Sequence, residues 1–306
     1  MNVRAVLPVL TGLLLLGCND GNDSESIDSI SFSSMALSEC VSQSASYNDY
    51  EKIGEVEVLS CRSTDSGLLD QNALEEMSQF YNLKTLHLGY MGSQVDFDGS
   101  LFPNLQTFRC DDCGIQTMDL SQNPELTSFE IWTNRYLNEL DFSHNPNLTK
   151  LNLAGVSIID LDLGSQEFLQ EAYLVGRNPY RDLRFLDFSE ATALEKLDML
   201  FIGADYLDLS NNKALSWLDI RNSNLESIVI GSQVLQRYAV MDSYLYSVDV
   251  EAFPELRSLV LYGNQIGYIN LDQNPNLELV NLEKNPLSTE MLSYLQSISW
   301  VDRIVY

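Results

Sequence analysis

The sequence is poor in basic residues. Its 306 residues include 17 lysines and arginines against 44 aspartates and glutamates, for a formal net charge of −27. Nucleic-acid phosphates and anionic lipid headgroups are bound by basic surfaces. We therefore expect no nucleic-acid partner and no direct binding to an anionic membrane surface. Such a balance suits a solvated domain, or one that meets cations or a basic partner.

Recognisable catalytic motifs are also missing. The only two histidines are His87, at an outward strand position, and His144, in a turn, and neither accompanies a known nucleophile motif. There is no glycine-rich phosphate loop and no HExxH zinc motif. We predict that the protein is not an enzyme and has no cofactor or metal, with calcium on its acidic residues as the alternative.

Long hydrophobic runs are confined to the N-terminus. Arg4 precedes an apolar run at residues 5–16, which is too short to span a bilayer and predicts a signal peptide at residues 1–17. The run ends in Leu-Leu-Gly-Cys, which resembles the lipobox of bacterial lipoproteins. The resemblance implies cleavage before Cys18 and acylation of Cys18, for example with palmitate. Asn19, in place of an aspartate, favours delivery to the outer membrane or cell surface.

The segment after this cysteine is small, polar and acidic. Such a composition buries too little apolar surface to become ordered. Residues 18–31 are therefore predicted to be a flexible tether between the lipid and the folded domain.

Most of the remaining chain is a repeat. The sequence of residues 256–277 reads L-x-x-L-x-L-x-x-N-x-I-x-x-I-x-L-x-x-N-P-x-L. The first leucine of this unit recurs at intervals of 20 to 25 residues, at Leu83, Leu105, Leu126, Leu148, Leu169, Leu194, Leu215, Leu235, Leu256 and Leu277. The L-x-L core has a period of two and predicts a strand whose leucines share one face. One unit cannot bury that face alone, so the units must stack.

This pattern resembles the leucine-rich-repeat family, in its short bacterial form, over residues 53–285. The resemblance implies a mostly β solenoid of the α/β horseshoe class, with short helices mainly in the caps. It also implies that an inward asparagine after L-x-L bonds the backbone of adjacent turns. Only Asn134, Asn264 and Asn285 fill this position here, so we expect the middle of the array, at residues 83–285, to be less regular.

A second apolar–polar–apolar run in each unit predicts strands on both faces. Its central residue is usually an aspartate, and these are Asp119, Asp141, Asp162, Asp187, Asp208 and Asp249. Serines lie two residues after four of them, which favours bonding within a turn. The alternative is cation binding along the column. Asn-Pro pairs after several of these runs mark turns.

Both ends of the array are predicted to be capped. Residues 32–82 are predicted to form an N-terminal cap with short helices and the first, longer repeat. Residues 286–306 are predicted to form a C-terminal cap with a helix that begins near Ser288. Cys40 and Cys61 are expected to form a disulfide, because four cysteines remain in an exported chain after lipidation. Cys110 and Cys113 are interpreted as buried thiols, with a local disulfide as the alternative, because an extended strand would hold them too far apart.

An outward face of the main sheet is the candidate binding site. Seven apolar or aromatic residues and one arginine are predicted to share it: Trp132, Tyr173, Val175, Leu200, Trp217, Arg221, Met241 and Tyr262. Scattered surface hydrophobic residues are the alternative. The arginine-containing insertion at residues 177–184 is interpreted as a surface loop, or as a loop that helps to bind an anionic or aromatic group. We expect a membrane-anchored, extracytoplasmic module that binds a protein, in adhesion or envelope recognition. Glycan binding and a purely structural envelope role are the alternatives.

Overall fold

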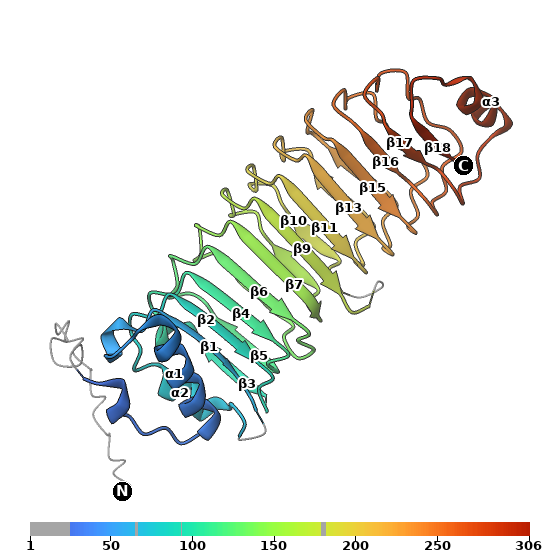
Figure 1. The fold of residues 1–306 in the computed structure, drawn as a ribbon. Coiled ribbons are helices and arrows are strands. Elements are labelled where there is room, and N and C mark those ends of the chain that lie inside the picture. The colour runs from blue at the N-terminus through green and yellow to red at the C-terminus, as the bar shows by residue number, and fades with distance from the viewer. Residues whose placement is uncertain (1–24, 65–66, 93, 179–181) are drawn as a thin grey trace, which may run out of the picture.

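The protein is a solenoid of stacked parallel strands (Figure 1). The computed structural model describes residues 25–64, 67–92, 94–178 and 182–306. Within these residues one sheet of 12 strands runs the length of the molecule, and every pairing in it is parallel. In spatial order its strands are β1 (Val58–Arg62), β2 (Thr85–Gly89), β4 (Thr107–Asp111), β6 (Ser128–Trp132), β7 (Lys150–Val156), β9 (Glu171–Gly176), β11 (Lys196–Leu200), β13 (Trp217–Arg221), β15 (Arg237–Met241), β16 (Ser258–Val260), β17 (Leu279–Asn281) and β18 (Arg303–Val305). The predicted leucine-rich-repeat solenoid is confirmed.

The second face of the solenoid carries shorter strands. Those in the described residues pair in twos: β3 (Val95–Asp98) with β5 (Ile115–Asp119), β8 (Asp160–Asp162) with β10 (Phe185–Asp187), and β12 (Tyr206–Leu209) with β14 (Ser227–Ile230). Residues 140–142 and 248–250, also expected as strands, are not part of these ladders. Strands are thus present on both faces, but only the main sheet is continuous.

The core is the space between the two faces. The second and fourth positions of the main-sheet strands point into it, and residues such as Leu86, Leu218 and Leu259 are completely buried there. Phenylalanines fill it in the N-terminal half, where Phe108 stacks on Phe129 with ring centroids 5.4 Å apart. Because each inward residue packs against its equivalents in neighbouring turns, the apolar repeat becomes one continuous core.

Each main-sheet strand leads into a tight turn, and left-handed backbone is common there. The residue directly after the strand has positive φ in many turns, for example Asp112 (53°), Thr133 (58°), Phe201 (56°) and Asn222 (49°). Gly155, within the irregular end of β7, and Gly263 also have positive φ. Left-handed backbone is costly for residues with a Cβ, so the stacked neighbours must hold these turns in place.

Buried side-chain amides bond successive turns to one another. Most of them do not come from the position after L-x-L that the repeat pattern predicted for this role. Asn264 bonds the carbonyl groups of Val240 and Leu261, as the repeat predicts. A second column, which includes the asparagines of several Asn-Pro pairs, does the same elsewhere: Asn123, Asn145, Gln166, Asn212 and Asn274 donate to carbonyl groups of the preceding turn. The main sheet continues through the middle of the array, with a register shift between β7 and β9 at residues 154–156.

The N-terminal cap is built from two helices. Helix α1 (Met35–Asn48) is capped by the Ser34 side chain and packs against β1, and α2 (Gln71–Met77) is capped by Asp70. The predicted Cys40–Cys61 disulfide is present and joins α1 to β1. Helix α1 thereby covers the first edge of the sheet, which would otherwise expose unpaired strand.

Part of the predicted tether also belongs to this cap. A short 3-10 helix at Ile27–Ser29 precedes α1, Ser26 bridges to Lys52, and Ile27 is buried. Two further 3-10 turns lie at Ile53–Glu55 and Gly99–Leu101. The predicted signal peptide and Cys18 lie outside the described residues, as does the first part of the tether.

The C-terminal cap is one helix and one strand. Helix α3 (Thr289–Ser297) begins after Ser288, whose hydroxyl accepts from the Met291 amide. Tyr294 of α3 donates to Asp272 and accepts from the Leu271 amide. Strand β18 then adds to the sheet beside β17. Among the described residues, no helix combines the length and the apolar character needed to cross a bilayer.

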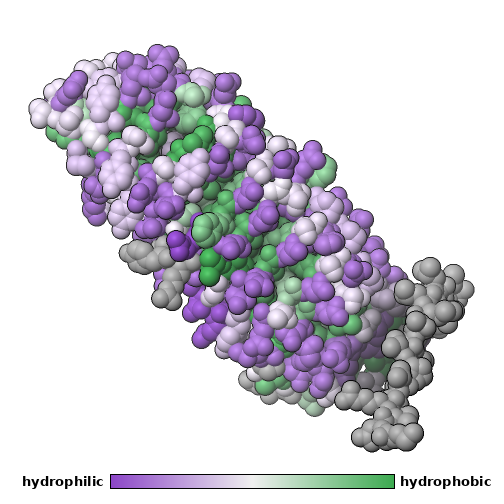
Figure 2. All heavy atoms as spheres, turned by 180° about the vertical axis from the view of Figure 1, so that it is seen from behind, coloured by the Kyte–Doolittle hydropathy of each residue, from purple (hydrophilic) through white to green (hydrophobic). Residues whose placement is uncertain are grey.

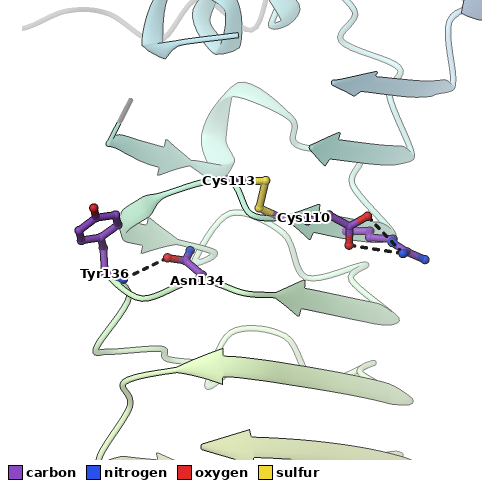
Figure 3. Close-up of a disulfide and its surroundings, with 6 residues drawn as sticks. Cys110, Cys113, Asn134 and Tyr136 are labelled. Atoms are coloured by element: carbon purple, nitrogen blue, oxygen red, sulfur yellow. Dashed lines mark hydrogen bonds and ion pairs between the residues drawn. A yellow bond between two sulfur atoms is a disulfide. The ribbon is translucent and has the colours of Figure 1, made fainter. Parts of the chain in front are cut away.

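Cys110 and Cys113 are joined by a disulfide, with Cα atoms 5.8 Å apart (Figure 3). The interpretation as free thiols was wrong, because it assumed an extended chain. The backbone instead turns directly after β4, where Asp112 and Gly114 both have positive φ. The turn brings the two cysteines within disulfide reach, and both are fully buried.

Candidate functional site

The candidate residues all lie on the outward face of the main sheet. The fifth position of five neighbouring strands forms one row in register across β6, β7, β9, β11 and β13, and β15 extends it. This row contains Trp132, Ala154, Val175, Leu200, Arg221 and Met241. Tyr173 lies in the central row and Trp217 in the first row of the same face. Tyr262 follows β16 and bonds the Asp242 amide through its carbonyl oxygen.

Two of the aromatic residues meet above β7. The rings of Trp132 and Tyr173 have centroids 5.8 Å apart, although β7 separates their strands. The β7 residues between them, Asn152 and Ala154, are only 7% and 9% exposed. The two rings therefore cover the outward surface of β7.

A hollow of about 190 Å³ lies beside this aromatic pair. Its polar rim is formed by three consecutive strands: Lys150 and Asn152 from β7, Glu171 from β9, and Lys196 and Asp198 from β11. The Asn152 amide oxygen is buried without a hydrogen-bond partner. Burial raises the pKa of the Asp198 carboxyl above its usual range, although Arg221 lies 3.8 Å away.

A charged network forms the centre of the face. Asp219 is fully buried and accepts from Arg221 Nε at 2.6 Å and from Arg237 at 2.8 Å. Arg237 also lies over the Trp217 ring, 4.8 Å from its centroid, and Lys196 lies 5.8 Å from the same centroid. Charge-assisted bonds and cation–π contacts thus hold Trp217 in place.

The N-terminal part of the face is polar. Lys150 bonds Glu130 at 2.5 Å, and Arg109 lies 3.2 Å from Asp111. Burial raises the pKa of Glu130, but the hydrogen bond and charge of Lys150 outweigh it and leave the pKa below its usual range. Burial, followed by the charge of Arg109, lowers the pKa of His87 on β2. The strands that precede β6 contain none of the predicted site residues, of which Trp132 is the first.

Tyr262 stands apart from the other aromatic residues. Lys284, in the turn after β17, lies over its ring at 4.7 Å from the centroid. Six strand spacings separate β6 from β16, or roughly 29 Å at about 4.8 Å per strand. The structure therefore groups Trp132 with Tyr173 and places Tyr262 at the far end of the same face.

The outward face differs in charge from the rest of the protein. On the three outward rows the basic residues are Arg62, Arg109, Lys150, Lys196, Arg221, Arg237 and Arg303, and the acidic residues are Asp111, Glu130, Glu171, Asp198, Asp219 and Glu283. Seven basic residues against six acidic ones make this face nearly neutral in a chain whose net charge is −27. The excess acidity lies elsewhere.

Part of that acidity is in the aspartate column of the second face. The carboxylate of each aspartate accepts a hydrogen bond from the backbone amide two residues later: Ser121, Ser143, Gly164, Ser189, Ser210 and Glu251. These bonds lower the pKa of Asp119 and Asp141. The predicted turn role is confirmed. In the part of the chain that the structure describes, no group of three or more metal-ligating side chains is placed to hold an ion.

Exposed apolar residues are not confined to the main sheet. Ile159 and Phe185 are 50% and 62% exposed, and both belong to the region of the shorter strands. Seen from behind, the surface has hydrophobic residues gathered at mid-length among hydrophilic ones (Figure 2). Apolar exposure alone therefore does not distinguish the outward face of the main sheet from the second face, whereas its nearly neutral charge does.

The arginine-containing insertion is organised by an acidic residue. Asp182 is buried and accepts from the backbone amides of Arg177 and Asn178. Arg184 lies over the Phe185 ring at 5.6 Å. Residues 179–181, which include Arg181, are outside the described part of the chain.

Several important residues were missed from sequence. Asn152, Lys196, Asp219 and Arg237 occupy the first and central rows beside the predicted aromatic residues. The alternation placed these rows outward as well, but only their aromatic members Tyr173 and Trp217 were selected as site residues. The burial and pairing of the missed residues depend on side chains from adjacent strands.

No family model matches the chain, and no curated protein matches it either. Solved structures do. The functional domain of InlJ from Listeria monocytogenes, whose title notes a cysteine ladder, is similar with a TM-score of 0.52 and 21% identity, over 76% of this chain and 60% of that one. This chain thus spans less than two thirds of that structure. A chain of the octameric complex of latrophilin 3, Unc5D and the leucine-rich-repeat protein FLRT2 has a TM-score of 0.55 and 17% identity, over 75% of this chain and 78% of that one. The described residues therefore have the fold of a leucine-rich-repeat protein.

Proposed function

We propose that the protein is a binding module that recognises a protein partner through the outward face of its main sheet. The supporting observation is the near-neutral charge of this face in a strongly acidic chain. Charges of like sign repel an approaching partner and reduce its rate of association. A partner that itself has a negative net charge is therefore repelled least at this face.

The rigidity of the face supports the same proposal. Binding energy concentrates in tryptophan, tyrosine and arginine side chains that lose little freedom on association. Trp217 and Arg237 are already held together, and Trp132 is held against Tyr173. Asp219, between two arginines, fixes the centre of the face.

One similar structure supports a protein partner as an analogy. The complex of latrophilin 3, Unc5D and FLRT2 contains a leucine-rich-repeat domain in an assembly with other proteins. Because a shared fold does not determine a ligand, the residues of the outward face carry the proposal.

Site-specific crosslinking tests it. A photoreactive amino acid at Leu200 or Met241 should crosslink to the partner, whereas the same group at Asp187, on the second face, should not. The double variant Trp132→Ala/Tyr262→Ala should lose partner capture by at least tenfold and keep its melting temperature within a few degrees. Equal crosslinking from Asp187, or undiminished capture by the double variant, would exclude this face.

We further propose that the module is exported and lipid-anchored, at the outer membrane or cell surface. This rests on the signal sequence and on the lipobox-like residues that end at Cys18. Metabolic labelling with a fatty acid should mark the wild-type protein, and the Cys18→Ser variant should remain unlabelled. A labelled Cys18→Ser variant, or a mature chain that begins elsewhere, would reject the anchor and leave the binding face untouched.

A further inference from the structure

The hollow beside Trp132 and Tyr173 combines an aromatic wall with a rim of both charges. Lys150, Glu171 and Lys196 occupy equivalent positions on three adjacent strands, so positive and negative groups alternate along one side. Asn152 and Asp198 line the hollow from the central row. A ligand group of either charge would meet a repelling neighbour at this rim.

A neutral ligand that both donates and accepts hydrogen bonds has no such conflict. A hydroxyl group donates to the carboxylates of Glu171 and Asp198 and accepts from the ammonium groups of Lys150 and Lys196. The aromatic pair supplies an apolar surface on the other side. A sugar ring matches both sides of the hollow. Its hydroxyl groups can bond the polar rim, and its apolar C–H groups can stack on the aromatic pair.

The Asn152 side chain is a second, independent observation. It is 7% exposed, it lines the hollow, and its amide oxygen has no hydrogen-bond partner. An unpartnered buried acceptor is unfavourable for folding. A sugar hydroxyl group bound in the hollow would donate the hydrogen bond that this oxygen lacks.

We propose that this hollow is a binding site for one neutral sugar unit, with Asn152 as its central acceptor and Trp132 and Tyr173 as its stacking surface. The inference goes beyond protein recognition and concerns only the region around β7 and β9. Contacts to a protein partner at Trp217 or Tyr262 do not depend on it.

Saturation-transfer NMR of the full-length protein with a panel of neutral sugars tests the proposal. The panel contains glucose, galactose, mannose and N-acetylglucosamine, and sialic acid and a sulfated sugar represent charged ligands. We expect at least one neutral sugar to bind and, by stacking on the aromatic pair, to change the fluorescence of Trp132. Failure of all the neutral sugars to bind, or stronger binding of the charged ones, would overturn the proposal.

Two variants separate this site from the rest of the face. Asn152→Leu should weaken sugar binding at least tenfold and raise the melting temperature, because it removes a buried group without a partner. Tyr262→Ala, at the far end of the face, should leave sugar binding unchanged and weaken protein capture. Unchanged sugar binding in Asn152→Leu would reject the site even if protein capture through Trp217 and Tyr262 persists.

Discussion

Arg237 lies over the indole ring of Trp217, with its guanidinium carbon 4.8 Å from the ring centroid. The same guanidinium bonds the buried carboxylate of Asp219 at 2.8 Å. Arg237 of β15 thus contacts both an aromatic ring and an acid of the neighbouring strand β13. This arrangement fixes the orientation of the most exposed tryptophan on the outward face of the main sheet.

Loss of the shared acid should destabilise the protein. Asp219→Ala leaves Arg221 and Arg237 without their closest acceptor and should lower the free energy of unfolding by about 2–3 kcal/mol. Denaturant unfolding followed by tryptophan fluorescence measures the change. Asp198→Asn is the matched control on the adjacent strand, and it should be neutral or stabilising, because burial already raises the pKa of Asp198. Equal losses in the two variants would contradict the assignment of Asp219 as the centre of the network.

Relief of a left-handed turn should stabilise the protein. Thr133 is exposed and β-branched, and its φ is 58°. Such a conformation costs about 1–2 kcal/mol in a residue with a Cβ, so Thr133→Gly should raise the melting temperature. Gly155→Ala, at the equivalent position of the next unit with a φ of 71°, should lower it. Calorimetry of both variants checks the opposite signs.

The disulfide of the N-terminal cap should contribute more to stability than the local one. Cys40 and Cys61 are separated by 21 residues, whereas Cys110 and Cys113 are separated by three. Loop-closure entropy predicts a loss of about 3 kcal/mol for Cys40→Ala/Cys61→Ala and about 2 kcal/mol for Cys110→Ala/Cys113→Ala. Protease digestion should cut the first variant within the cap, while the second stays resistant there. A resistant cap in the first variant would show that packing of α1 on β1 suffices.

The C-terminal cap should weaken at alkaline pH. Burial and the hydrogen bond to Asp272 raise the pKa of Tyr294 to about 12, above an ordinary value of about 10. Because the folded-state pKa is the higher one, the stabilising contribution is complete below pH 10 and is lost as the pH rises toward 12. Tyr294→Phe should lower stability by about 1–2 kcal/mol at pH 8. The difference between the two proteins should shrink above pH 10, and a constant difference would contradict the role of the phenol proton.

Much of the fold followed from periodicity alone. The L-x-L cores gave the strands, their spacing gave the number of turns, and the alternation gave the outward rows that contain Trp132 and Leu200. The helix start near Ser288 followed from the residue types of a short segment, and the Cys40–Cys61 pair followed from the number of cysteines. These properties can be predicted because each repeated sequence unit adopts the same local structure.

Tertiary structure decided the properties that depend on neighbouring turns. The Cys110–Cys113 pair required the positive φ of Asp112, and the meeting of Trp132 with Tyr173 required the small outward surface of β7. The burial of Asp219 required arginines from its own strand and from the next one. A linear pattern records which face a side chain takes, because that is set by the strand period. It does not record what covers the side chain, because the covering groups come from strands some 20 residues away in the chain, at about 4.8 Å in space.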